Sequence, residues 1–107
     1  MNCIKLLAEL GQTEITEKNK AVKVLLSEHT VTVIDINLLN GEILSKHSAS
    51  SPITVLCFSG EGVFKAGENL EQEQKLTPGT LIYLEKGISH EVTAEPNLRI
   101  LVTKFAE

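Results

Sequence analysis

The sequence is poor in aromatic residues, with three phenylalanines, one tyrosine and no tryptophan among its 107 residues. So few aromatic rings leave little for stacking nucleic-acid bases or for building an aromatic cage around a cation. Positive charge is also scarce, because Lys and Arg total 10 against 14 Asp and Glu, which gives a net charge of −4. Nucleic-acid binding depends on a basic surface that displaces counterions. We therefore expect no nucleic-acid partner.

Cysteines are equally few, and Cys3 and Cys57 lie far apart without a CxxC spacing. They predict neither a disulfide framework nor a zinc knuckle. No apolar run approaches the roughly 18 residues that a membrane-spanning helix needs. The N-terminal apolar segment is too short for a signal peptide and lacks a small-residue cleavage site. We therefore expect a cytoplasmic protein without a membrane partner.

The hydrophobic content of 42% and the length predict one globular domain over residues 1–107. Residues 1–20 form an N-terminal arm, in which residues 4–10 (IKLLAEL) favour either a helical turn or an extended segment. From residue 21 onward, short runs rich in β-branched residues predict strands. Turn sequences separate these runs, namely Asn40-Gly41, Ser59–Gly62, Thr77–Gly79, Glu85–Gly87 and Glu95–Asn97. This pattern is typical of an all-β sandwich or small barrel.

Glycines and histidines recur at a specific spacing in the second half of the chain. Five residues separate Gly41 from His47, and Gly60 follows in register. A second set comprises Gly79, then Glu85 after five residues, and finally Gly87 and His90. Over residues 37–105 this pattern resembles the two motifs of small single-domain cupins. The resemblance implies an RmlC-like jelly-roll barrel, also called a double-stranded β-helix, and members of this kind often form homodimers.

The resemblance also implies a site, because typical cupins bind a metal through three histidines and a glutamate. His47 and His90 match the first and last of those histidines. Ala49 and Ile53 stand at the other two ligand positions and cannot coordinate a metal. The resemblance therefore implies at most a residual site, at which His47 and His90 hold a divalent transition metal such as Zn, Ni, Fe or Mn.

The residues leave open what the two histidines do. A transition metal needs at least three good protein ligands, so a further ligand would have to be found. Cys57 is four residues from Ile53 in the same predicted strand, so both side chains would face inward. Glu91 is next to His90 and would face away from it. The histidines could instead be neutral wall residues bonded to each other, to a hydroxyl or to water, or a metal-free pair that binds a ligand.

These observations support two classes of function. The first is a barrel that binds a small molecule in its interior, with His47, His90, Cys57 and Tyr83 as candidate ligand-binding residues. The alternative is a metal-dependent enzyme of the dioxygenase or isomerase type, with both histidines as metal ligands. Epimerase chemistry with Tyr83 is disfavoured, because Arg99 is the only arginine available for a sugar phosphate. Catalytic residues and enzymatic activity stay unassigned.

Two predicted strands, residues 54–58 (TVLCF) and 81–84 (LIYL), carry apolar residues on both faces. A strand that is apolar on both sides is buried on both sides. If Cys57 faces the interior, then Leu56 and Phe58 face outward and need a cover. The N-terminal arm or a partner subunit could supply it, and we expect a homodimer.

Overall fold

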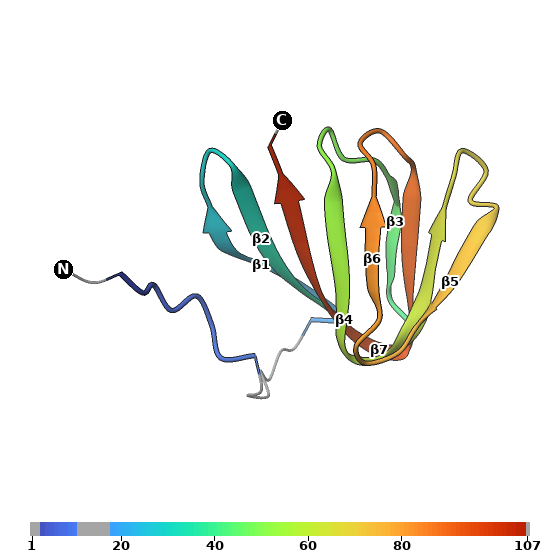
Figure 1. Cartoon of the computed structure of the whole chain (residues 1–107). Coiled ribbons are helices and arrows are strands. Elements are labelled where there is room, and N and C mark those ends of the chain that lie inside the picture. Colours follow the sequence, from blue (N-terminus) through green and yellow to red (C-terminus); the bar gives the residue numbers. More distant parts are fainter. Residues whose placement is uncertain (1–2, 11–17, 107) are drawn as a thin grey trace.

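The computed structural model describes residues 3–10 and 18–106, and within these ranges it contains strands and no helix. The strands are β1 Lys20–Ser27, β2 Val31–Leu38, β3 Ile43–His47, β4 Ile53–Ala66, β5 Gln72–Leu76, β6 Leu81–Leu84 and β7 His90–Phe105. The predicted all-β fold is therefore confirmed (Figure 1). No helix in the described ranges is long and apolar enough to cross a membrane.

The described part of the N-terminal arm is extended rather than helical (Figure 1). Ile4 and Leu6 in this segment are exposed, so neither side chain packs on the sheet. A helix this short is unstable in water unless tertiary packing supports it. Of the two conformations that the sequence allows, the extended one is observed.

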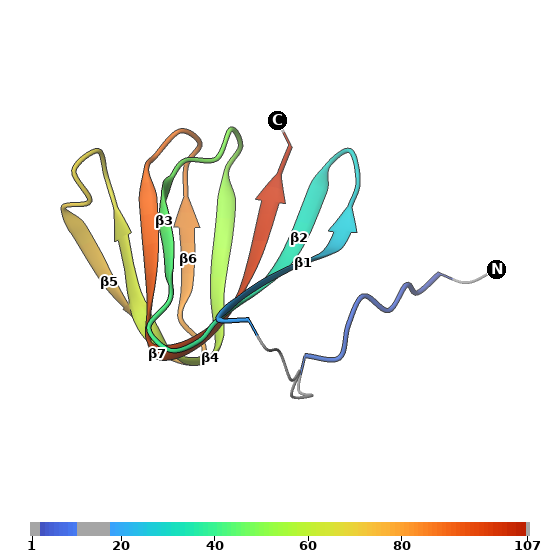
Figure 2. The same ribbon diagram turned by 180° about the vertical axis from the view of Figure 1, so that it is seen from behind.

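The seven strands form one strongly bent antiparallel sheet in the order β1-β2-β7-β4-β5, with β3 on β7 and β6 on β4. The two long strands hold the fold together, because each pairs along its halves with different neighbours. The second half of β7 pairs with β2 and its first half with β3, while β4 pairs first with β6 and then with β5. The sheet therefore folds over on itself, and its two halves face each other (Figures 1 and 2).

Two predicted turns are instead bends within these long strands. Ser59–Gly62 lies inside β4 and Glu95–Asn97 lies inside β7, and the register between the strands shifts at this point. Gly60 has a φ of 78°, and a Cβ atom there would overlap the carbonyl oxygen of Asn97. A glycine allows both the positive φ and the close approach of two backbones. The prediction that chain reversals occur at these two segments is therefore wrong.

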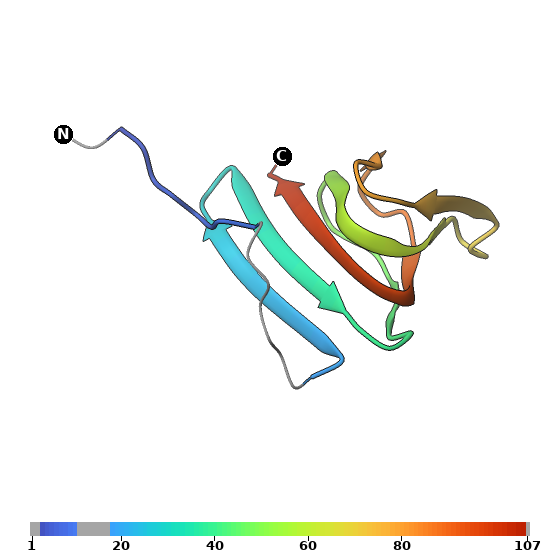
Figure 3. The ribbon, with the colours of Figure 1, turned by 90° about the horizontal axis from the view of Figure 1, so that it is seen from below.

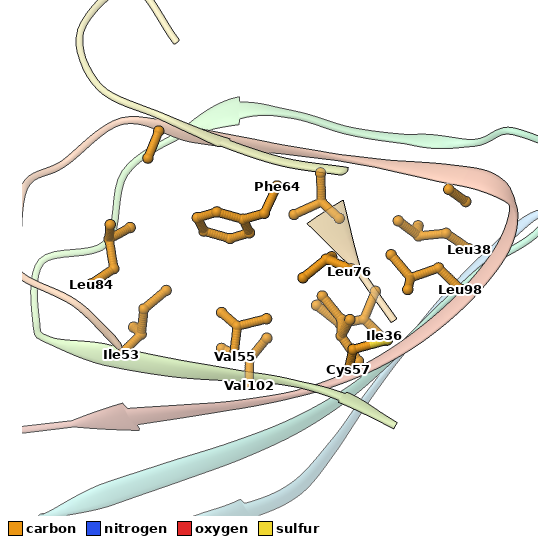
Figure 4. Close-up of a cluster of buried hydrophobic side chains, with 14 residues drawn as sticks. Ile36, Leu38, Ile53, Val55, Cys57, Phe64, Leu76, Leu84, Leu98 and Val102 are labelled. Carbon is orange, nitrogen blue, oxygen red and sulfur yellow. The ribbon is translucent and has the colours of Figure 1, made fainter. Parts of the chain in front are cut away.

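The hydrophobic core lies between the two halves of the sheet (Figure 4). At the bend, Leu38, Leu76, Leu98 and Cys57 are almost fully shielded from solvent. Strands β4 and β7 supply this core through alternate residues, because successive side chains of a strand point to opposite faces. Both histidines line a cavity between the two halves of the sheet.

An ion pair is buried on the outer face of the sheet. The guanidinium of Arg99 donates to both carboxylate oxygens of Asp35, through Nε at 3.0 Å and Nη2 at 2.7 Å. Its third nitrogen, Nη1, donates to the carbonyl oxygen of Leu10 at 3.0 Å. The same guanidinium lies 5.6 Å from the centre of the Phe58 ring. Arg99 thus ties the arm to the sheet and partly covers an outward-facing aromatic residue. Figure 3 shows the described arm extending beyond the sheet.

Candidate functional site

A cavity of about 170 Å³ lies between the two halves of the sheet. Its wall is mostly hydrocarbon, and three basic side chains complete it. The lining residues are Val22, Ile34, Ile36, Leu44, His47, Ala49, Ile53, Val55, Phe64, His90, Val92, Ile100, Val102 and Lys104. Neither an aspartate nor a glutamate is among them. The cavity is therefore an apolar pocket with a basic edge.

The fold brings the two predicted histidines together at this cavity. His47 ends β3 and His90 begins β7, and the two residues are register partners in the antiparallel pair. Their ring centres are 4.1 Å apart, with an angle of 62° between the ring planes. The ring of Phe64 stacks on His90, with the ring centres 5.6 Å apart and an angle of 13° between the ring planes. His90 is only 4% exposed, whereas His47 reaches solvent.

Backbone hydrogen bonds fix which nitrogen of each ring carries a proton. Nδ1 of His47 lies 2.6 Å from the carbonyl oxygen of Ser45, and Nδ1 of His90 lies 3.0 Å from that of Ile88. A carbonyl oxygen can only accept, so Nδ1 is the donor in both bonds. In the neutral ring the proton-free nitrogen is then Nε2. Each histidine therefore has Nε2 available to accept a hydrogen bond or to bind a metal.

The surroundings of His90 favour its neutral form. Burial lowers the pKa of this imidazole most, since a charged ring loses its hydration there. The hydrogen bond to the carbonyl of Ile88 acts in the opposite direction, and the nearby His47 and Lys104 lower the pKa further. The pKa of His90 therefore lies below its ordinary value. At neutral pH its Nε2 carries a lone pair.

Lys104 is a member of the site that the sequence analysis missed. It lines the cavity near the C-terminal end of β7 and is the register partner of Ile53, which lines the cavity beside Ala49. Within residues 3–10 and 18–106 it makes no ion pair. The sequence could have placed Lys104 in the cavity lining, because it alternates along one strand with Ile100 and Val102 and so shares their face. Lys104 thus adds a cationic side chain to an apolar lining, and no described carboxylate pairs with it.

The two other candidate ligand-binding residues lie elsewhere. Cys57 faces inward, as its parity with Ile53 predicted, but it lies near the bend and does not line the cavity. It is 0% exposed, and burial followed by the charge of Glu61 raises the pKa of its thiol. Tyr83 is 61% exposed and lines a separate hollow along β5 and β6. The fold brings neither residue to the histidine pair.

The residues at the cavity do not fit the metal site of a typical cupin. Two Nε2 atoms are suitable ligands, but Ala49 and Ile53 offer no donor atom and Cys57 is remote. Among the described residues, no three His, Cys, Asp or Glu side chains come close enough to share a metal ion. The cation of Lys104 in the same lining would also repel a metal. These residues alone do not make a complete metal site.

No protein-family model matches the sequence, and no curated protein does either. Solved structures do match. A cupin superfamily protein from Desulfitobacterium hafniense is 16% identical, with a TM-score of 0.82 over 100% of this chain and 94% of that one. The chain has the cupin fold. An RmlC-like cupin from Desulfovibrio desulfuricans agrees, with 17% identity, a TM-score of 0.81, and coverage of 95% of this chain and 96% of that one.

The solved structures that match this chain include an enzyme. The DMSP lyase DddQ from Ruegeria pomeroyi matches with a TM-score of 0.74 and 17% identity, over 83% of this chain and 48% of that one. Identities this low establish the shared fold and not a shared activity, since one fold hosts many functions. The function of this cupin barrel therefore has to be argued from its own cavity.

Proposed function

We propose that this cupin barrel binds a small molecule in its interior, with His47 and His90 at the polar end of the site. One observation carries the proposal, namely an apolar cavity at whose edge two adjacent imidazoles have Nε2 free. Small-molecule sites generally combine an apolar pocket with a few converging polar groups. Ala49 and Ile53, which cannot bind a metal, extend the apolar wall instead.

The volume limits the size of the ligand. An apolar cavity of about 150 Å³ holds one benzene molecule, and this cavity measures about 170 Å³. The hydrocarbon part of the ligand should therefore match a benzene ring or a short alkyl chain. Hexan-1-ol meets this limit, and its hydroxyl can donate to Nε2 of either histidine.

The test is a titration of the full chain with hexan-1-ol, followed through the backbone amide signals in NMR spectra. Shifts confined to the cavity lining support the proposal. The variant Ala49→Phe should abolish them, because a half-buried residue of the lining would then fill the space. Ala21→Phe is the matched control, since Ala21 lies on β1 outside the lining. Binding that survives Ala49→Phe, or a complete lack of binding by hexan-1-ol and its charged analogues, would overturn the proposal.

One observation favours the alternative, a metal-dependent enzyme of the dioxygenase or isomerase type. Histidines that bind metals usually donate their second ring nitrogen to a carbonyl or carboxylate, as His47 and His90 both do. The experiment is metal analysis of tag-free protein by mass spectrometry, beside His47→Ala and His90→Ala. Stoichiometric Zn, Ni, Fe or Mn that is lost in both variants would favour this alternative. A metal content unchanged by either substitution would retire it.

We also propose that the protein is a homodimer. Ile4 and Leu6 on the extended arm are exposed, and Leu56 on the outer face of β4 is only half-buried. Burial of such apolar surface between two copies would be favourable. Light scattering at micromolar concentration tests this proposal. A monomer mass would refute it, and a dimer that is lost in Ile4→Ser/Leu6→Ser would place the arm in the interface.

A further inference from the structure

The three polar side chains of the cavity lie at one end of the barrel and are all basic. His47 ends β3 and His90 begins β7, and these two residues pair with each other. Lys104 lies near the other end of β7, where it pairs with Ile53. Because β7 is bent, both of its ends lie at the same end of the barrel, opposite the bend (Figures 1 and 2). His47, His90 and Lys104 form what we term the basic rim.

The opposite end of the barrel is apolar and tightly packed. Leu38, Leu76 and Leu98 occupy the bend, and each is 2% exposed or less. Between these leucines and the basic rim, the cavity is lined by aliphatic side chains, Ala49 and Phe64. A molecule in the cavity would thus meet positive charge at one end and only hydrocarbon at the other. This arrangement matches an amphipathic anion.

Lys104 indicates which charge the ligand carries. An ammonium group at an apolar cavity loses hydration and is stabilised by a nearby anion. No described carboxylate supplies that anion, since Lys104 makes no ion pair and the lining holds no Asp or Glu. A neutral ligand would leave this charge uncompensated, and a cationic ligand would be repelled.

Resting on the proposed function, we infer that the ligand is a small apolar monocarboxylate, with its carboxylate at the basic rim and its hydrocarbon part in the cavity. Lys104 pairs with one carboxylate oxygen. A histidine Nε2 donates to the other oxygen after it takes up a proton from solvent. That proton is needed because both Nδ1 protons are already committed to backbone carbonyls. The cavity volume limits the hydrocarbon part to the size of a benzene ring or a hexyl chain.

The proton requirement makes carboxylate binding depend on pH. The titratable or charged groups that face His90 are His47 from β3 and Lys104 from the far end of β7, while β4 contributes Phe64. Because burial lowers the pKa of His90, this ring takes up a proton only as the pH falls below neutrality. Binding of a carboxylate should therefore strengthen as the pH is lowered below neutrality. Binding of a neutral alcohol should depend less on pH, because its hydroxyl can donate to a neutral Nε2 or accept from a protonated one.

The test compares hexanoate, hexan-1-ol and hexylammonium by isothermal titration calorimetry with the full chain. These probes share one alkyl chain and differ in the charge of the head group. We expect hexanoate to bind roughly tenfold or more tightly than hexan-1-ol, as a charge-assisted hydrogen bond would give. Hexylammonium should bind more weakly than either probe. Equal affinities for hexanoate and hexan-1-ol would overturn the inference and leave the proposed function standing.

Two variants locate the anion. Lys104→Met keeps the apolar stem and removes the charge, so hexanoate binding should weaken roughly tenfold and hexan-1-ol binding should persist. Retained alcohol binding also shows that the variant is folded with its cavity intact. Lys65→Met is the matched control for net charge, because Lys65 pairs with Glu73 on the surface and does not line the cavity.

Three further outcomes decide the inference. A hexanoate affinity that Lys104→Met does not change would overturn it. A hexanoate affinity that does not rise as the pH is lowered below neutrality would remove the histidines from the carboxylate site. If none of the three probes binds, the proposed function fails together with the inference.

Discussion

The Arg99–Asp35 pair offers a stringent test of the packing on the outer face of the sheet. Its side chains are 11% and 5% exposed, and two hydrogen bonds of 3.0 Å and 2.7 Å join them. The substitution Asp35→Ala removes the two carboxylate oxygens that accept from Nε and Nη2 of the buried guanidinium. Removal of one partner from a buried ion pair costs about 3–5 kcal/mol of the free energy of unfolding. The whole protein is stabilised by only about 5–15 kcal/mol.

The assay is urea denaturation at fixed pH, with the unfolding midpoint and the m-value fitted separately. With an m-value of about 2 kcal/mol per molar urea, a loss of about 3–5 kcal/mol lowers the midpoint by about 1.5–2.5 M. The matched control is Glu73→Ala, which breaks the exposed Lys65–Glu73 pair at 3.6 Å. An exposed pair contributes at most about 1 kcal/mol, so this midpoint should move by less than about 0.5 M.

The double variant Asp35→Leu/Arg99→Met separates the ion pair from the space that it fills. Both charges are removed together, so no buried charge stays unpaired and much of the lost stability should return. The reasoning is refuted if Asp35→Ala shifts the midpoint no more than Glu73→Ala does. It is also refuted if the double variant is less stable than Asp35→Ala alone.

Three other predictions follow from single positions. Gly60→Ala should cost about 2–5 kcal/mol of stability, from its positive φ and the overlap with a facing carbonyl, whereas Gly79→Ala, with positive φ and open space, should cost only about 1–2 kcal/mol in the same denaturation assay. Because the folded-state pKa of His90 is depressed, its contribution to stability is present above the unfolded-state pKa and is lost as pH falls through the folded-state pKa. Thermal unfolding at a series of pH values should show that His90→Phe loses less stability on acidification than the unsubstituted protein does. An unchanged pH profile would contradict this prediction. With a chromogenic disulfide reagent, Cys3 should react promptly and Cys57 only on unfolding, because Cys57 is buried with a raised thiol pKa; prompt reaction of both thiols would contradict this.

The strands and most of their boundaries could be predicted from the sequence. The alternation of apolar and polar residues and the turn residues each affect only the few residues around them. The Pro78–Gly79 turn is an example, since Gly79 adopts the positive φ of 94° and the amide of Thr80 donates to the carbonyl of Thr77. The bends at Gly60 and at Glu95–Asn97 could not be told from turns. A glycine permits a reversal and a close backbone approach equally, and only the facing strand decides between them.

The spacing of the glycines and histidines resembles the cupin motifs, and this resemblance implied that His47 and His90 meet at one end of a barrel. In the structure the two are register partners. Tertiary structure alone decided the rest of the site. It placed Cys57 at the bend, turned Tyr83 outward, and brought Lys104 from the end of the chain to the same rim. The physical reason is that strand parity tells which face a side chain takes, whereas its depth in the barrel depends on how the long strands bend.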